Sequence, residues 1–309
     1  MVHPQSMYQS LLVPFDGSPL SASAVPVAAA LARHTGATIH LALVFDPSAY
    51  IPFVPGEVAV PVYDAELVQE HRAQDQALLD AAVSELQAQD IKAHGVLLEG
   101  TIIEALCEQA RACRADLTVM TTHGRRGFQR FRLGSVAADY LTRATEPVLM
   151  VRGAGSDAVP ELPTGPLLCP LDGSPFAETI LPHARQFAEV AGMTMALTAV
   201  SVPRAMPMAP FGAEALLADT GALEAQEEGR EGYLRRIAAT LPAGTTANAV
   251  TDMAVGRALN EEAARLNAGA IALSTHGRGG IKRFLFGSVA DELLRHATVP
   301  LLVYRPDSK

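Results

Sequence analysis

Apolar runs and amphipathic runs alternate along the chain from its beginning. Ser10–Pro14 is a continuous apolar run that leads into a turn at residues 16–19, Asp-Gly-Ser-Pro. Such a run is typical of a strand that is buried on both faces of a parallel sheet. Serine suits an N-cap and proline the first helical position, so the pattern predicts a helix from Pro19 to about His34. Gly36 is expected to end this helix.

The same alternation continues through the first half of the chain. The predicted strands after the first are residues 38–44, 91–99, 117–120 and 147–151, and the predicted helices are residues 64–89, 102–113 and 135–144. Residues 47–61 contain four prolines and form a long connection, so they are either a lid or a disordered crossover.

The sequence of the first half then occurs a second time. Residues 167–175 read LLCPLDGSP and repeat residues 11–19, which read LLVPFDGSP. About half of the positions in residues 121–152 are identical to their counterparts in residues 274–305, which is far above chance. The chain is therefore an internal duplication.

A stretch rich in glycine and proline separates the two copies. We place the first domain at residues 1–153, the linker at residues 154–165 and the second domain at residues 166–309. The predicted strands of the second domain include residues 193–200, 246–251, 270–274 and 300–304, and its predicted helices include residues 213–240, 257–266 and 288–296. This alternation predicts two doubly wound α/β domains with mostly parallel sheets.

Each copy contains a glycine-rich loop between an apolar run and a helix, at residues 121–135 and 274–288. Gly124 and Gly127 let the backbone approach a ligand, and residues 134–135 start a helix whose N–H groups favour an anion. Basic side chains add positive charge to both loops: Arg125, Arg126, Arg130, Arg132, Arg278, Lys282 and Arg283. These features favour a polyphosphate ligand, although such loops also occur in α/β domains that bind none.

Asp16 and Asp172 follow the first strand of each copy. In open α/β sheets ligands bind outside the carboxyl ends of the strands, where a carboxylate accepts hydrogen bonds from ribose hydroxyls. The alternative role of such an aspartate is to cap the helix that follows. His123 and His276 have neither an acidic partner nor metal-ligand spacing in the sequence, so loop packing is the favoured role for both.

Composition and motifs argue against several classes of protein. A formal net charge of −9 argues against a nucleic-acid binder, and three cysteines without paired spacing indicate core positions in a reducing compartment. The first ten residues lack the features of a signal peptide, and no apolar run is long enough to span a bilayer. A phosphate loop with lysine, zinc-ligand spacing and a nucleophile elbow are also absent. We therefore expect a cytoplasmic binding protein, without catalytic residues or a metal site.

The loops and aspartates together resemble the universal stress protein family, in its tandem two-domain form. ATP-binding members of that family carry Gly-x2-Gly-x9-Gly-Ser/Thr after the fourth strand. Here Gly124 and residues 134–135 fit the later part of this motif, as Gly277 and residues 287–288 do in the second copy. The resemblance implies Rossmann-like domains of the adenine nucleotide alpha hydrolase type, each with five parallel strands in the order 3-2-1-4-5.

The resemblance also implies a nucleotide site in each domain. The aspartate and a backbone group of the second strand would hold the adenosine, and the loop glycines and serine would hold the phosphates. In the first domain the implied residues are Pro14, Asp16, Val44, Met120, Thr121, Gly124, Gly134 and Ser135. In the second domain they are Pro170, Asp172, Val200, Leu273, Ser274, Gly277, Gly287 and Ser288.

Thr121 and Ser274 depart from the family motif, since each stands where its first glycine would be. A side chain there either narrows the approach of a phosphate or donates a hydrogen bond to it. The leading hypothesis is a stress-response protein that binds ATP, or AMP or ADP, together with Mg2+. The alternatives are a nucleotide-free interaction protein of the same fold and a slow ATPase.

The resemblance further implies that the two domains associate through their last strands. Residues 147–151 and 300–304 are apolar and would otherwise be bare edges that invite aggregation. Antiparallel pairing of the two within the chain would make an intramolecular pseudo-dimer. The family also makes a homodimer of two chains plausible, and whether two chains associate stays open at this point.

Overall fold

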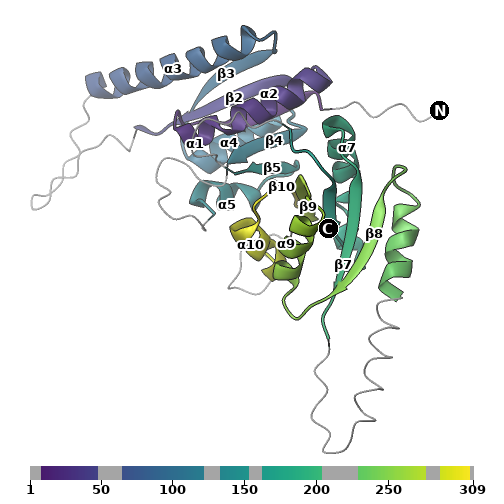
Figure 1. Ribbon diagram of the computed structural model, residues 1–309. Helices are drawn as coiled ribbons and strands as arrows, with labels where there is room; N and C mark the ends of the chain where they lie inside the picture. The colour runs from purple at the N-terminus through teal and green to yellow at the C-terminus, as the bar shows by residue number, and fades with distance from the viewer. Residues whose placement is uncertain are drawn as a thin grey trace, which may run out of the picture. The chain divides into compact units, whose positions relative to one another are not determined.

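The computed structural model describes residues 8–47, 65–121, 133–152, 162–203, 229–275 and 286–306. The chain divides into two compact units, Met1–Leu162 and Pro163–Lys309, which we call the first and the second domain (Figure 1). Parallel strands alternate with helices in both.

The first domain is a doubly wound α/β domain. Its described strands are β1 (Ser10–Pro14), β2 (Thr38–Phe45), β3 (Ala93–Glu99), β4 (Leu117–Thr121) and β5 (Val148–Val151). Its described helices are α1 (Pro19–Ala22), α2 (Ala24–Thr35), α3 (Ala65–Gln87), α4 (Ile102–Ala112) and α5 (Ser135–Leu141). The strands pair in parallel in the order β3-β2-β1-β4-β5, which confirms the predicted fold class and strand order.

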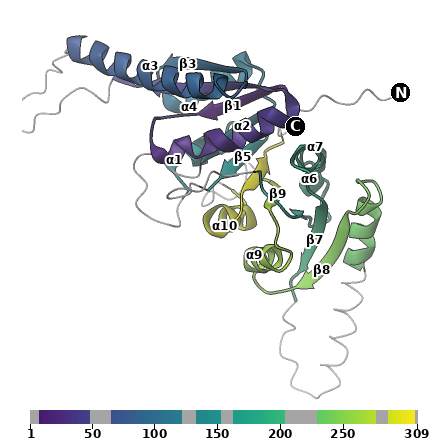
Figure 2. The same cartoon turned by 45° about the horizontal axis from the view of Figure 1, so that its top comes forward.

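The central strands carry the core of this domain. All of β4 and the first four residues of β1 are buried, as expected for strands covered on both faces. α2 packs on β1, β2 and β4, whereas α4 packs on β1, β2 and β3 and against α5. α3 contacts β2 and β3 and runs along β3 in both views (Figures 1 and 2).

The first predicted helix is divided into two in the structure. α1 ends at Ala22 and α2 begins at Ala24, and between them the Oγ of Ser23 donates to the carbonyl of Leu20 at 2.7 Å. Pro26 has no N–H to bond the carbonyl of Ala22, and its ring clashes with that carbonyl, which accounts for the interruption. Gly36 ends α2 in the left-handed conformation, with φ of 73°, as predicted.

The second domain repeats the architecture. Its described strands are β6 (Leu167–Pro170), β7 (Met195–Ser201), β8 (Thr246–Thr251), β9 (Ala270–Ser274) and β10 (Leu301–Tyr304). Its helices are α6 (Pro175–Glu178), α7 (Leu181–Ala191), α9 (Val255–Arg265) and α10 (Ser288–His296), with a further helix over residues 229–238. The parallel order is β8-β7-β6-β9-β10. Residues 213–228 of the predicted long helix, and most of both proline-rich stretches, lie outside the described residues.

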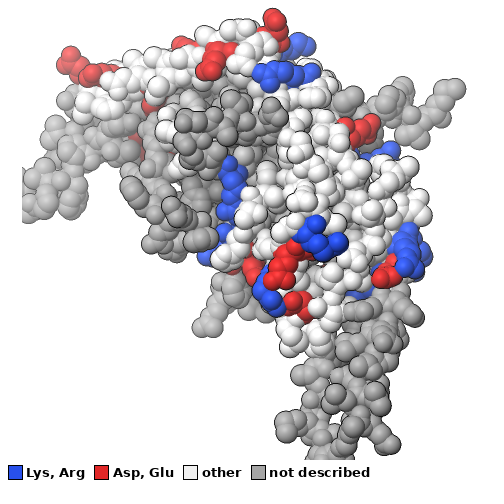
Figure 3. All heavy atoms as spheres, in the orientation of Figure 1, with Lys and Arg blue, Asp and Glu red and all other residues white. Residues whose placement is uncertain are grey.

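Charged side chains of the second domain form ion pairs within or next to two of its helices. Blue and red side chains adjoin one another over the region of α9 and α10 (Figure 3). Arg257 of α9 pairs with Asp252, which precedes that helix, and Arg295 pairs with Asp291 within α10, both at 2.8 Å. Among the described helices, none is both long and apolar enough to cross a membrane.

The three cysteines are free thiols. Cys107 and Cys113 are half-buried on and just after α4, and Cys169 is fully buried in β6. Burial raises the pKa of the Cys169 thiol to about 12, so this group stays protonated and packs as a small apolar side chain.

Candidate functional site

The site residues predicted for the first domain lie at the carboxyl ends of three neighbouring strands. β1 pairs with β2 on one side and with β4 on the other. Pro14 ends β1, Thr121 ends β4 after Met120, and Val44 is the last but one residue of β2. Asp16 follows two residues after β1 and therefore opens at the same edge of the sheet, where α/β domains bind ligands.

The second domain places its counterparts in the same way. β6 lies between β7 and β9, so Pro170, Val200 and Ser274 lie at or next to the carboxyl ends of three adjacent strands. Leu273 is buried one residue before the end of β9, and Asp172 follows β6. The two domains therefore place equivalent predicted site residues at the same edge of their sheets.

Asp16 holds the turn between β1 and α1. Its Oδ1 accepts a hydrogen bond from the backbone N–H of Ser18 at 2.9 Å and another from the Oγ of Ser21 at 2.5 Å. Ser18 in turn caps α1, because its Oγ accepts from the N–H of Ser21 at 3.1 Å. Asp16 therefore does not cap the helix itself; it supports the cap by binding the N–H of Ser18, the residue that caps α1.

Asp172 has fewer hydrogen bonds and more exposure than Asp16. Its Oδ1 accepts from the N–H of Ser174 at 2.9 Å, and Ala177 stands where the first domain has Ser21. Partial burial acts to raise the pKa of Asp172, but the hydrogen bonds from Ser174 and the charge of Arg230 outweigh it. The pKa lies below its ordinary value. Asp172 is therefore an ionised acceptor at neutral pH.

The side chain that replaces the first motif glycine in the second domain is bonded within the fold. Ser274 Oγ lies 2.8 Å from Thr179 Oγ1, and the Thr179 hydroxyl donates to the carbonyl of Phe176 at 2.6 Å. A hydroxyl carries one proton, so Ser274 is the donor to Thr179. The counterpart in the first domain, Thr121, is buried.

The Gly-Ser pairs begin helices, as predicted. Gly134 and Gly287 are the N-cap residues of α5 and α10, and neither cap has a side-chain hydrogen bond. Ser135 and Ser288 follow as exposed first residues of these helices, where backbone N–H groups lack helical partners. The other predicted loop residues lie outside the described residues: Gly124, Gly127, Gly277, His123, His276 and the basic side chains of both loops.

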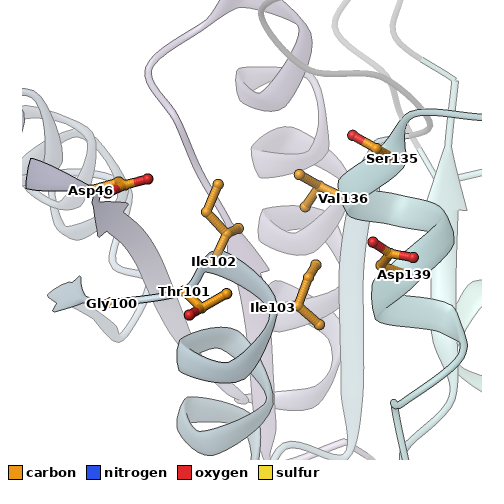
Figure 4. Close-up of a pocket in the computed structure, with 8 residues that line it drawn as sticks. All are labelled: Asp46, Gly100, Thr101, Ile102, Ile103, Ser135, Val136 and Asp139. Carbon is orange, nitrogen blue, oxygen red and sulfur yellow. The ribbon is translucent and has the colours of Figure 1, made fainter. Parts of the chain in front are cut away.

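A pocket of about 450 Å³ lies beside Ser135 in the first domain. It is lined by Asp46, by Gly100, Thr101, Ile102 and Ile103, and by Ser135, Val136 and Asp139. Figure 4 shows Asp46 on one side, the α5 residues on the other and the two isoleucines of α4 between them. Apolar side chains, two hydroxyls and two carboxylates therefore face one cavity, a mixture suited to a ligand with both a flat apolar part and polar groups.

Sequence reasoning identified only Ser135 among these lining residues. Asp46 follows β2, residues 100–101 join β3 to α4, and residues 102–103 begin α4, so these lining residues lie near the carboxyl ends of strands. That position is the one signal that points to them, because α/β sheets bind ligands at this edge.

Two doubly wound domains in tandem, each with an aspartate and a Gly-Ser helix start at the carboxyl edge of its sheet, define a duplicated Rossmann-like α/β protein. The model of the universal stress protein family matches residues 7–152 and again residues 164–305. The chain belongs to this family, as a tandem member, which confirms the resemblance found in the sequence.

Individual relatives agree with this assignment. A universal stress protein of Mycobacterium tuberculosis is 30% identical over 197 residues, which make up 62% of this chain and 62% of that protein. A universal stress protein of Methanocaldococcus jannaschii is 31% identical over 148 residues, 48% of this chain and 84% of its own length. The crystal structure of a universal stress protein from Archaeoglobus fulgidus covers 98% of this chain and 100% of its own, with a TM-score of 0.68 at 19% identity. This last likeness concerns the fold.

Proposed function

We propose that the protein is an ATP-binding universal stress protein whose nucleotide occupancy alters its stability or its choice of partner. One observation carries the proposal: in both domains a Gly-Ser helix start follows the strand that neighbours the aspartate-bearing strand. Helix N-termini of this kind favour phosphate, and an aspartate at the same edge favours ribose. The proposed role is binding, in a stress response, without catalytic residues.

In this proposal the residues divide into two groups. Asp16 and Asp172 hold the ribose, while the backbone of Val44 and Val200 and the side chains of Met120 and Leu273 hold the base. The phosphates lie at the helix starts, with the loop glycines Gly124 and Gly277 beside them. AMP and ADP would use the same groups with fewer phosphate contacts.

Mg2+ fits the donor set of the first domain. The carboxylates of Asp46 and Asp139 and the hydroxyls of Thr101 and Ser135 all line the pocket. Oxygen ligands of these types are what Mg2+ prefers, in combination with nucleotide phosphates. When bound with ATP, the ion would neutralise part of the phosphate charge next to these carboxylates.

The test is calorimetric titration with Mg-ATP of the wild type and of the double variant Gly134→Ala, Gly287→Ala. Gly287 has φ of −57°, and a Cβ there meets no atom within 4 Å among the described residues, so alanine is compatible with the fold. We expect heat of binding in the wild type and its loss in the variant, because a methyl group would obstruct the close approach of a phosphate. An absence of binding in both proteins would refute the proposal.

A nucleotide-free interaction protein of the same fold is the second candidate. The bond from Ser274 to Thr179 favours it, because this hydroxyl is engaged inside the fold where the motif glycine would stand. This candidate predicts that the melting temperature of the purified protein does not change when Mg-ATP is added. ATP binding to the folded state predicts a rise that grows with nucleotide concentration.

We also propose the domain association implied by the family: pairing of Val148–Val151 with Leu301–Tyr304 and a homodimer of the whole chain. Support comes from the apolar character of both strands, which would be costly as bare edges. Light scattering on the purified protein should give the mass of two chains. The mass of one chain would exclude the homodimer.

A further inference from the structure

Two carboxylates face the pocket of the first domain. Asp46 and Asp139 line it from opposite sides, and Thr101 and Ser135 line the same cavity with their hydroxyl-bearing side chains (Figure 4). Thr101 is the N-cap residue of α4, but its side chain makes no capping hydrogen bond, so its hydroxyl is not committed to the helix. Four oxygen-bearing side chains therefore surround one space in this domain.

The second domain keeps only half of this set of donors. The repeat gives the equivalent positions, since Thr101 and Ala254 are the N-cap residues of the corresponding helices α4 and α9. Two donors are lost and two are kept: Asp46 becomes Val202, Thr101 becomes Ala254, Ser135 becomes Ser288 and Asp139 becomes Glu292. Val202 is 40% exposed, so an apolar side chain stands where the first domain has a carboxylate.

A positive charge adds to the difference in the second domain. The Tyr233 hydroxyl donates to Glu178 Oε1 at 2.8 Å, which ties the helix over residues 229–238 to α6, just after the turn that carries Asp172. Arg230 lies about one helical turn before Tyr233, and its charge acts on the Asp172 carboxylate. A guanidinium therefore lies near the proposed ribose-binding aspartate of this domain.

The glycine-rich loops do not reverse this balance of charge. The first domain has three carboxylates at the edge, Asp16, Asp46 and Asp139, whereas the second has Asp172 and Glu292 together with the cation of Arg230. By sequence the first loop has four basic side chains and the second has three, which offsets one charge of that difference. The second edge remains the more favourable for a bare anion.

We propose that the two domains take different forms of the nucleotide: the first binds its Mg2+ complex, whereas the second also binds the metal-free nucleotide. In the first domain Asp46 and Asp139 would repel bare phosphates but would serve as ligands to Mg2+. In the second domain Val202 removes a repelling charge and a metal donor together, and Arg230 attracts the anion. This inference rests on the proposed nucleotide-binding function and states which domain needs the metal.

The test is calorimetric titration of the full chain with ATP, once with Mg2+ and once in EDTA. The single variants Gly287→Ala and Gly134→Ala leave the first and the second site, respectively, to be measured alone. We expect the first site to bind on the order of tenfold more weakly in EDTA, because two carboxylates then face the phosphates without metal. The affinity of the second site should change by about threefold or less.

A reciprocal exchange tests the residue that follows the second strand of each domain. Asp46→Val, added to Gly287→Ala, should reduce the Mg2+ dependence of the first site to about threefold. Val202→Asp, added to Gly134→Ala, should raise that of the second site to on the order of tenfold. Asp80→Val is the matched control: it removes an exposed acid of α3 that is not among the lining residues, and it should change neither dependence.

The guanidinium is tested separately. Arg230→Gln, added to Gly134→Ala, should weaken the binding of metal-free ATP by about threefold and that of Mg-ATP by less, because the metal complex carries less negative charge. An unchanged affinity for metal-free ATP would overturn the part assigned to Arg230. Melting temperatures close to those of the parent variants show that each protein is folded, and the two exchanges at Asp46 and Val202 test the proposal independently.

Two outcomes overturn the inference while nucleotide binding stands. One is a first site that binds ATP equally well with Mg2+ and in EDTA. The other is a pair of exchanged variants in which each domain keeps its original Mg2+ dependence. No heat from the wild type under either condition would instead contradict the proposed function itself.

Discussion

The turn after the first strand has the same sequence in both domains, Asp-Gly-Ser-Pro, but the two aspartates are held differently. Asp16 accepts hydrogen bonds from both Ser18 and Ser21, whereas among the described residues of its turn Asp172 accepts hydrogen bonds from Ser174, with Arg230 acting on it through charge. The backbone of the turn has thus been kept while its side-chain support has diverged. The aspartate of this motif therefore contributes more to the stability of its turn in the first domain than in the second.

The cores of the two domains also differ, because the first has a side-chain hydrogen-bond network where the second has apolar residues. In the first domain Thr118 and Tyr140 both donate to Glu146 Oε1, at 2.7 and 2.5 Å. The duplication places Ile271, Leu293 and Val299 at these three positions. A polar network below one site corresponds to apolar packing below the other, so the two domains should respond differently to pH and to substitution.

The largest expected difference concerns the two turns. Asp16→Ala would leave the buried N–H of Ser18 without its acceptor, and the buried hydroxyl of Ser21 would lose its 2.5 Å bond and keep the carbonyl of Ser18 at 3.1 Å. We expect a loss of about 2–3 kcal/mol of unfolding free energy, against about 1 kcal/mol for Asp172→Ala. Urea unfolding of both variants measures it. Equal losses would show that the hydrogen bonds of Ser21 add nothing.

The polar core network should appear as a dependence on alkaline pH. Burial, and then the charge and hydrogen bond of Glu146, raise the pKa of Tyr140 above its ordinary value of 10.0. A pKa that is higher in the folded state means that stability is fully present below pH 10 and falls as pH rises above it. Tyr140→Phe should cost about 1–2 kcal/mol at pH 7 and reduce that alkaline fall.

Leu293→Met is the matched control for this prediction. It changes the corresponding position of the second domain without altering a titrating group, so its unfolding curve should run parallel to that of the wild type from pH 7 to 11. If Tyr140→Phe and the wild type lost stability equally above pH 10, the tyrosine would not be the group responsible.

The smallest expected effect concerns the first motif position. Ser274→Gly restores the family glycine and removes the hydrogen bond to Thr179, at a cost of about 1 kcal/mol. Affinity for ATP should be equal or higher, because no side chain then stands beside the phosphates. Thr179→Val removes the same bond and leaves Ser274 in place, so it separates the stability effect from the binding effect. A weaker affinity in Ser274→Gly would instead mean that the hydroxyl serves the ligand.

The fold could be predicted because its signals are local and repeated. β1, β8, β9 and α10 have the predicted bounds, since apolar runs and Gly-Ser starts mark them directly. The interruption at Ser23 was not predicted, although Pro26 is a direct signal for it, since a proline cannot bond the carbonyl four residues earlier.

The pocket could not be predicted from the sequence, for a different reason. Its lining comes from three segments that only the strand order brings together, and Asp46 carries no motif. Patterns along a chain report which residues are buried, but they do not report which side chains meet across elements.

The adenine nucleotide content of freshly purified protein tests the central claim most directly. Acid extraction and chromatography of the wild type and of the double variant Gly134→Ala, Gly287→Ala would give it, at matched protein concentration. The account predicts adenine nucleotide in the wild-type extract, at a substantial fraction of the chain concentration, and little in the variant. Equal trace amounts in both extracts would contradict it.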